Sequence, residues 1–325
     1  MSGVSFGMLD PYGKNLFDCF KASVGSDFHW FAWQFRTFAE DSGIDDESTR
    51  LLVKGFVLRI VSACREVEKA VPGFGVEFIG RLAAVKAKAK NIQQYEQLLQ
   101  LLAELFILRR VATYSWPEPV KFDYEPPSST SKKNPEIIVR CQDFEFGVEV
   151  KCPAILNHVK ARGKKGVQAV GRAMPLDSLQ GVSGGDVMLP RDNPIKDFLI
   201  SANEKFAGHQ RAGFFGLLFI FWDEFLNEPI SALTNPGSGL LTDNSFHKED
   251  GIAVKYPHVD GVVLVPSFHI LSYATGHEGI NGFVDFLDYG DPNEYPFRAL
   301  VPVSTQLDKL PGDVLACCGA HPHDT

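Results

Sequence analysis

The chain has little that would mark a secreted, disulfide-stabilised or membrane-spanning protein. Its six cysteines show no disulfide-framework spacing and no CxxC pair, so we expect most of them to be reduced core residues. The longest apolar run, 214–222, is too short to cross a bilayer. The amino terminus lacks a basic stretch followed by an apolar one. These features favour a cytoplasmic protein with no membrane partner.

An excess of positive charge is also missing. The formal net charge is -8, which argues against a surface covered in positive charge for bulk nucleic-acid binding but leaves room for a local basic groove. Hydrophobic residues make up 45% of the chain and charged residues 22%, as in folded proteins. At 325 residues the chain is long enough for one large domain or two. We expect a helical region at 1–85, a main domain at 86–305 and a tail at 306–325.

Aromatic residues crowd the first 44 positions, where the periodicity does not separate a short helix from irregular packing. We interpret this cluster as core rather than as a binding surface; it comprises Phe28, Trp30, Phe31, Trp33 and Phe35. A clearer helix follows from Asp45, which can act as its cap, to about Pro72. Its apolar face is formed by residues at helical spacing: Leu52, Phe56, Ile60, Cys64 and Val67.

A second long helix is predicted over 80–113, with a basic start and an almost wholly apolar stretch at 98–108. One polar stripe interrupts the apolar surface at intervals of four, three and four residues: Gln93, Gln97, Gln100 and Glu104. Such a stripe is either solvated or, in the alternative, turns Glu104 toward an active centre. Glu96 competes with Glu104 for that role, although it lies off the stripe.

Two β-strands are predicted between Asn134 and Pro153, after a first strand at 122–125. In the second of the pair, apolar side chains alternate with Glu145, Gly147, Glu149 and Lys151, so Glu149 and Lys151 share a face. An acid and an amine two residues apart, with the Val150 carbonyl nearby, suit a hard-cation site beside a group that handles protons. The alternative is an ordinary exposed ion pair along one strand.

The remaining pattern completes an α/β core with a mixed sheet. A helix is predicted at 193–206, capped by Asn193, followed by strands at 216–222 and 259–265 with a loop-rich insertion at 223–257. Polar residues at the end of that helix could reach a phosphate or a water: Asn203, Lys205, His209, Gln210 and Arg211.

Pro135-Glu136, followed after a hairpin by Glu149-Val150-Lys151, resembles the signature of the PD-(D/E)xK nuclease superfamily. Glu136 stands where that superfamily more often has aspartate, and its longer side chain changes the geometry available to a metal. The resemblance extends over about 93–265. It implies a restriction-endonuclease-like mixed β-sheet flanked by helices. The main domain at 86–305 would then be a nuclease-like domain.

The resemblance also implies a set of site residues. The catalytic residues would be Glu104, Glu136, Glu149 and Lys151. The metal ligands would be Glu104, Glu136, Glu149 and the carbonyl of Val150. Mg²⁺, or Mn²⁺ in its place, would be the cofactor, since such ions prefer oxygen ligands.

A basic, glycine-rich segment follows the second strand of the pair. Its charged residues are Lys160, Arg162, Lys164, Lys165 and Arg172. Such a run is either a solvated loop or, next to a phosphodiester-cleaving centre, a contact to backbone phosphates.

Two functions of different classes follow. The first is a metal-dependent endonuclease that acts on nucleic acid, DNA in preference to RNA, as in a restriction or defence enzyme with residues 1–85 and 223–257 setting specificity. The second is a non-catalytic protein that binds nucleic acid or another partner on a nuclease-like scaffold. The combination of two acids and a lysine favours the first. A homodimer is left open.

Overall fold

The computed structural model divides into two compact units, and the first is built from two separate stretches of sequence. That unit comprises 1–115 and 268–290, and the second comprises 116–267 and 291–325. The structure describes residues 10–25, 29–40, 47–85, 92–128, 133–154, 167–168, 181, 187–188, 194–223, 225–243, 245, 253–275, 285–290 and 298–322, of which 33, 37–40, 47–52, 167–168, 187–188 and 322 are described in backbone alone.

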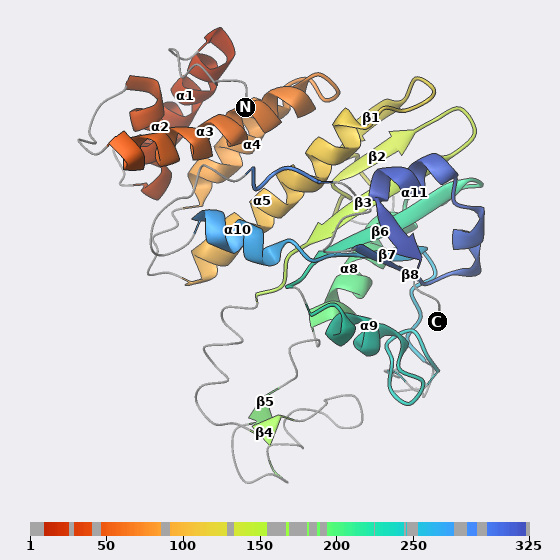
Figure 1. Cartoon of the computed structure of the whole chain (residues 1–325). Coiled ribbons are helices and arrows are strands. Elements are labelled where there is room, and N and C mark those ends of the chain that lie inside the picture. The colour runs from red at the N-terminus through yellow and green to blue at the C-terminus, as the bar shows by residue number, and fades with distance from the viewer. Residues whose placement is uncertain are drawn as a thin grey trace. The chain divides into compact units, whose positions relative to one another are not determined.

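The regular secondary structure described in the first unit is helical (Figure 1). Its helices are α1 Pro11–Val24, α2 Trp30–Glu40, α3 Glu47–Glu68, α4 Phe74–Ala84, α5 Ile92–Thr113 and α10 Phe268–Thr275. Asp10 caps α1, since its carboxylate accepts a hydrogen bond of 2.9 Å from the Gly13 N–H. Helix α3 confirms the predicted helix that ends before Pro72, while Asp45, its proposed cap, lies outside the described residues.

The prediction of one helix over 80–113 is wrong. Helix α4 ends at Ala84, because Val85 takes an extended conformation and its N–H bonds to the Leu82 carbonyl. Helix α5 begins at Ile92. The apolar spacing continues through both helices, so periodicity alone could not show that the first of them ends at Ala84.

The aromatic cluster near the amino terminus is core, as predicted. Phe31 and Phe35 are fully buried, and Phe31 packs edge-on against Phe20 and Phe56 at centroid separations of 5.6 and 6.0 Å. These contacts join α1, α2 and α3. Phe28 and the side chain of Trp33 lie outside what the structure describes.

The second unit contains a mixed sheet of seven described strands, which confirms the α/β class. Their order is β1-β2-β3-β6-β7-β8-β9. Strand β3 pairs antiparallel with β2 and parallel with β6, and β6 pairs parallel with β7. The bounds are β1 Lys121–Tyr124, β2 Ile137–Arg140, β3 Glu145–Lys151, β6 Phe214–Phe221, β7 Gly261–Val265, β8 Arg298–Pro302 and β9 Ala320–Pro322.

Each strand predicted from the sequence is present, with its ends shifted by one or a few residues. The predicted insertion at 223–257 contains the helix α9 Asn227–Thr234. Near the carboxyl terminus, η1 Thr305–Lys309 and α11 Gly312–Cys318 precede β9, which pairs parallel with β8. Strands β4 Val167–Gln168 and β5 Val187–Met188 form a separate parallel pair.

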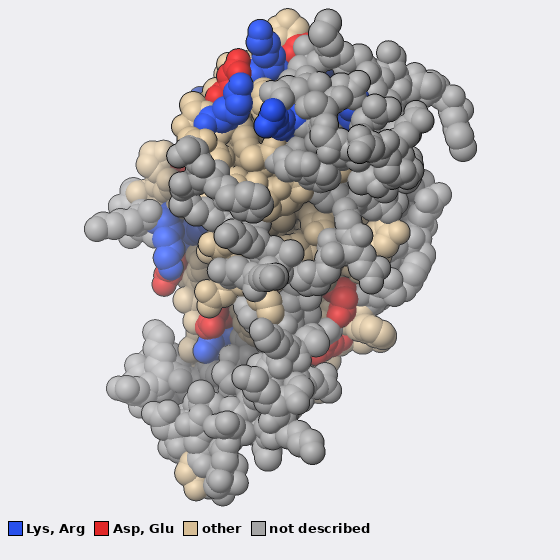
Figure 2. Space-filling model, turned by 90° about the vertical axis from the view of Figure 1, so that its left-hand side faces the viewer, with Lys and Arg blue, Asp and Glu red and all other residues tan. Residues whose placement is uncertain are grey.

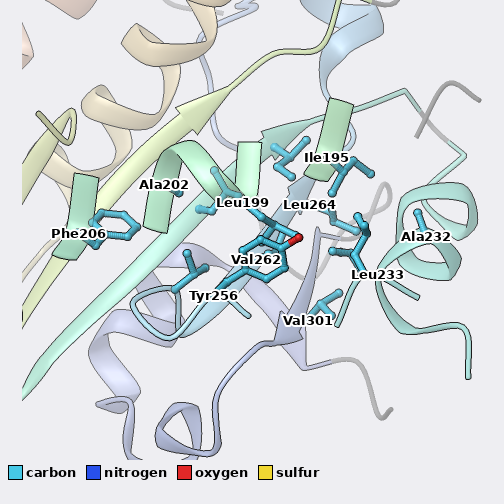
Figure 3. Close-up of a cluster of buried hydrophobic side chains, with 14 of the residues drawn as sticks. Ile195, Leu199, Ala202, Phe206, Ala232, Leu233, Tyr256, Val262, Leu264 and Val301 are labelled. Atoms are coloured by element: carbon cyan, nitrogen blue, oxygen red, sulfur yellow. The ribbon is translucent and has the colours of Figure 1, made fainter. Parts of the chain in front are cut away.

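Helix α8 Pro194–Ala207 covers one face of this sheet, as predicted for a helix between β3 and β6. Its apolar side packs with β7, β8 and α9 in a buried cluster (Figure 3). The residues labelled there are Ile195, Leu199, Ala202, Phe206, Ala232, Leu233, Tyr256, Val262, Leu264 and Val301. The predicted cap, Asn193, lies outside the described residues.

Two glycines let α8 approach the sheet closely. Gly147 of β3 and Gly216 of β6 are register partners, and the ring of Phe206 lies over both. A Cβ atom at Gly147 would lie 2.8 Å from Phe206 Cε1, and one at Gly216 would lie 2.6 Å from Phe206 Cδ2. The absence of side chains at this register lets the end of α8 pack directly against the backbone of the two strands. We refer to Gly147 and Gly216 as the glycine seat.

Candidate active site

Glu149 of β3 and Glu136, which immediately precedes the neighbouring strand β2, lie on the α8 face of the sheet. Strand alternation places Glu149 on the same face as Gly147, over which Phe206 packs. Glu136 immediately precedes β2, and its N–H donates a 3.0 Å hydrogen bond to the Val148 carbonyl. The β2–β3 pairing thus brings together two acids that are separated by twelve residues of sequence.

Glu149 is fully buried and lies between two lysines. Lys151 Nζ is 2.6 Å from its Oε1, and Lys205 Nζ of α8 is 2.7 Å from its Oε2. The same Lys205 nitrogen lies 3.6 Å from Oε1 of Glu136, which is also buried. Lys205 therefore bridges the two carboxylates. We refer to Glu136, Glu149, Lys151 and Lys205 as the lysine cluster.

The end of α8 is held in place by contacts on either side of Lys205. Phe206 rests on the paired glycines, and the Asn203 side-chain oxygen accepts a 2.9 Å hydrogen bond from the His258 N–H. Lys205 also lies in the last helical turn, where a cation is favoured by the helix dipole. These side-chain contacts of Phe206 and Asn203 hold the end of α8 where Lys205 reaches the carboxylates.

The interpretation of Glu149 and Lys151 as an ordinary exposed ion pair does not describe this site. The Glu149 side chain has no exposed surface, whereas Lys151 and Lys205 keep 20% and 12% of theirs. Two carboxylates and two ammonium groups balance in formal charge. Burying a carboxylate without such partners would be costly, so the charges are interdependent.

The site has a donor set that Mg²⁺ can use. Oε1 of Glu149 is buried and has no aligned hydrogen-bond donor in the described part of the chain, even though Lys151 lies close to it. No group of three or more His, Cys, Asp or Glu residues among those described could hold a metal ion. Two carboxylates nevertheless fit Mg²⁺, because proteins commonly bind it with one or two carboxylates together with waters and substrate phosphates. Val150, whose carbonyl is also a predicted ligand, lies between Glu149 and Lys151 on β3.

Glu104 belongs to the first unit, where it takes part in a local network. Arg81 Nη2 lies 2.5 Å from its Oε2, and Gln100 donates a 2.9 Å hydrogen bond to its Oε1. Along the predicted stripe, Gln93 and Gln97 are exposed and Glu104 is buried. The roles assigned to Glu104 and, alternatively, to Glu96 stay predictions.

A second group of charges lies on the same face, at the other end of β3. Arg140 Nη1 lies 3.0 Å from both carboxylate oxygens of Glu145, and its Nε pairs with Asp123. Arg211 also pairs with Glu145. We refer to Asp123, Arg140, Glu145 and Arg211 as the arginine cluster. Arg211 and Asn203, which the sequence offered as phosphate contacts, are thus engaged within the protein.

The arginine cluster shifts the pKa values of its members in different directions. Burial raises the pKa of Glu145 against the opposing charge of Arg140. Burial also acts to raise the pKa of Asp123, but the hydrogen bond and charge of Arg140 outweigh it and lower that pKa. Nearby, burial and the charge of Arg140 lower the pKa of His209, whose ring stacks on Phe214.

The basic segment predicted to contact phosphates lies outside the described residues: Lys160, Arg162, Lys164, Lys165 and Arg172. On the face in Figure 2, described lysines and arginines lie close to acidic side chains. The prediction for this segment therefore rests on its sequence.

Comparison with known proteins adds no relative: no family model, curated protein or solved structure matches the chain. None of the described helices combines the length and apolar character that a membrane crossing requires.

Proposed function

We propose that the chain is a metal-dependent endonuclease that hydrolyses phosphodiester bonds, in DNA in preference to RNA. The observation that carries the proposal is the fully buried carboxylate of Glu149, which shares one sheet face with Glu136 and lies within 2.7 Å of two lysine nitrogens. A purely structural sheet has no need to bury acids at this place. The mixed sheet with α8 between β3 and β6 supports a restriction-endonuclease-like fold.

In this proposal each side chain has a separate task. Glu136 and Glu149, with the carbonyl of Val150, would hold the cation. When bound, Mg²⁺ supplies an oriented, more acidic water and stabilises charge on the attacked phosphate. Lys151 would position or deprotonate the water, or offset phosphate charge, from its place beside Glu149.

The test is cleavage by the purified full chain. Plasmid, linear DNA and RNA are each incubated with Mg²⁺, with Mn²⁺ or with a chelator, and metal binding is measured by calorimetry. We expect cleavage that requires the metal and that is faster on DNA than on RNA. The proposal is abandoned if none of these substrates is cut and calorimetry detects no metal.

Binding to DNA is tested separately at the basic segment. Neutralising Lys160, Arg162, Lys164 and Lys165 together should weaken DNA binding and flatten its dependence on salt, with the slope falling by about one for each phosphate that the protein no longer neutralises. An unchanged slope would make the segment a solvated loop.

One observation favours the second candidate, a non-catalytic binding protein on a nuclease-like scaffold. Lys205 already provides a positive charge between the two carboxylates, so the buried acids are neutralised without a metal. In that case DNA or another partner would bind with the same affinity in metal and in chelator, and no cut would form.

A further inference from the structure

Lys205 occupies the position between Glu136 and Glu149 that a cation shared by both carboxylates would take. Its nitrogen is 2.7 Å from one acid and 3.6 Å from the other. Lys151 differs, since its nitrogen lies 2.6 Å from Oε1 of Glu149 without hydrogen-bond alignment, and its side chain is more exposed. Lys205 is thus the lysine that bridges the acids.

An ammonium group and a divalent cation compete for such a place. Each is attracted by the same two negative charges, and in a buried site two cations a few ångströms apart repel strongly. With Lys205 in place the cluster is balanced in formal charge, so its attraction for a metal is weakened. Without the lysine charge the same carboxylates would carry an unbalanced negative charge.

Lys205 can leave this position without movement of the helix. A lysine carries its charge on a flexible four-carbon stem, whereas the backbone here is fixed by Phe206 on its glycine seat and by Asn203. A phosphate group arriving at the site would offer the ammonium a new partner of the same charge as the carboxylates.

We propose that Lys205 is an exchangeable counter-cation. It weakens the binding of a metal by Glu136 and Glu149 until a phosphodiester binds and its phosphate becomes the new partner of the ammonium group. The proposal rests on the metal and nucleic-acid binding of the function proposed above, and not on its cleavage step. It assigns Lys205 as a positioning residue that makes metal and nucleic-acid binding cooperative, a regulation of the same site.

The test measures Mn²⁺ affinity by calorimetry for the full chain and four variants, each checked for folding by circular dichroism. Lys205→Met and Lys205→Gln remove the charge, Lys205→Arg keeps it, and Lys151→Met is the matched control on the other side of Glu149. We expect Lys205→Met and Lys205→Gln to bind Mn²⁺ about tenfold tighter or more than the parent, and Lys205→Arg to match the parent. Lys151→Met should change affinity less.

A short DNA duplex provides the second readout. It should raise the Mn²⁺ affinity of the parent by a larger factor than that of Lys205→Met, in which the competing charge is already gone. Equal factors in both proteins would overturn the proposed coupling.

The outcomes separate this inference from the proposed function. If the parent binds Mn²⁺ and cuts DNA but Lys205→Met binds no tighter, the inference is overturned and the nuclease function stands. If the variants bind Mn²⁺ more tightly than the parent but no protein cuts, the inference stands and the nuclease function fails. If no protein binds Mn²⁺, both fail. If the two neutral variants do not fold, Lys205→Arg decides: parent affinity supports the inference, and tighter binding overturns it.

Discussion

The lysine cluster and the arginine cluster lie on one face of the same sheet, yet they differ in burial and in the nature of the cation. In the lysine cluster, Glu149 is completely buried. In the arginine cluster, Glu145 keeps 19% of its side-chain surface and Arg211 keeps 50%. The first lies toward the carboxyl end of β3, which runs parallel to β6, and the second lies at the amino end.

The two kinds of cation also differ in what they can do. Arginine stays charged and offers a rigid, planar set of donors, so Arg140 can fasten β1, β2 and β3 together through Asp123 and Glu145. Lysine presents a point charge that can change partners. Ligand sites of open α/β sheets lie outside the carboxyl ends of strands, where the lysine cluster is found.

The largest effect should come from removing the buried acid. Glu149→Ala should lose both metal binding and cleavage, and it should lower the free energy of unfolding by about 3–5 kcal/mol, because two lysines lose their central partner. Glu145→Ala is the matched control, an ion-paired glutamate on the same strand and face. Calorimetry, cleavage assays and urea unfolding compare the two variants. Equal losses of metal binding in both would contradict a metal site specific to the lysine cluster.

Lys151→Ala should separate catalysis from binding. Cleavage should be abolished, while metal affinity stays equal or rises, because a nearby positive charge is removed. Single-turnover cleavage and metal titration on the same preparation measure the two effects. A variant that cuts at the parental rate would remove the lysine from the mechanism and most of the nuclease assignment with it.

Gly216→Ala should disturb the seat of α8. Its Cβ would lie 2.3 Å from the His258 carbonyl oxygen and 2.6 Å from Phe206, so backbone or helix must shift. We expect a loss of about 1–3 kcal/mol in unfolding free energy, as in other overpacked cores, and weaker metal binding. Gly80→Ala is the control: it lies inside α4 with nothing within 4 Å, and alanine should stabilise that helix by about 0.5–1 kcal/mol. Loss of stability in both would mean that close packing is not the cause.

The smallest effect concerns pH and the arginine cluster. The pKa of Asp123 is lowered in the folded protein, so its contribution to stability is present above its unfolded pKa and is lost as pH falls through its folded pKa. Asp123→Asn should therefore cost at most about 1 kcal/mol at neutral pH, since the group is partly exposed, and nothing once the carboxyl is protonated in both states. Urea unfolding at several pH values measures this, and a deficit that persists in acid would point to poorer packing instead.

The sequence predicted the parts of the fold that depend on local periodicity. Alternation in β3 identified the face shared by Glu149 and Lys151, and the apolar run at 214–222 identified β6. The division between α4 and α5 was missed, because the helical spacing of apolar residues continues into both.

The sequence could not identify the partner that completes the lysine cluster. Lys205 was one of five polar candidates, and its pairing with Glu149 spans 56 residues. The sequence feature linked to this pairing is the presence of Gly147 and Gly216, over which Phe206 packs. Neither glycine stands out in the sequence, and only the β3–β6 register shows that they lie side by side. Long-range register of this kind is set by the whole sheet rather than by neighbouring residues.

The glycine seat also has a consequence for rate. Because Phe206 and Asn203 fix the backbone on both sides of Lys205, release of its ammonium group needs only rotation about side-chain bonds, which takes picoseconds to nanoseconds in exposed side chains and longer in packed ones. Domain closures and helix shifts take microseconds to milliseconds. The exchange of Lys205 for a metal should therefore need no hinge motion, so the encounter with nucleic acid, and not a rearrangement of the backbone, would set the pace of assembly of the site.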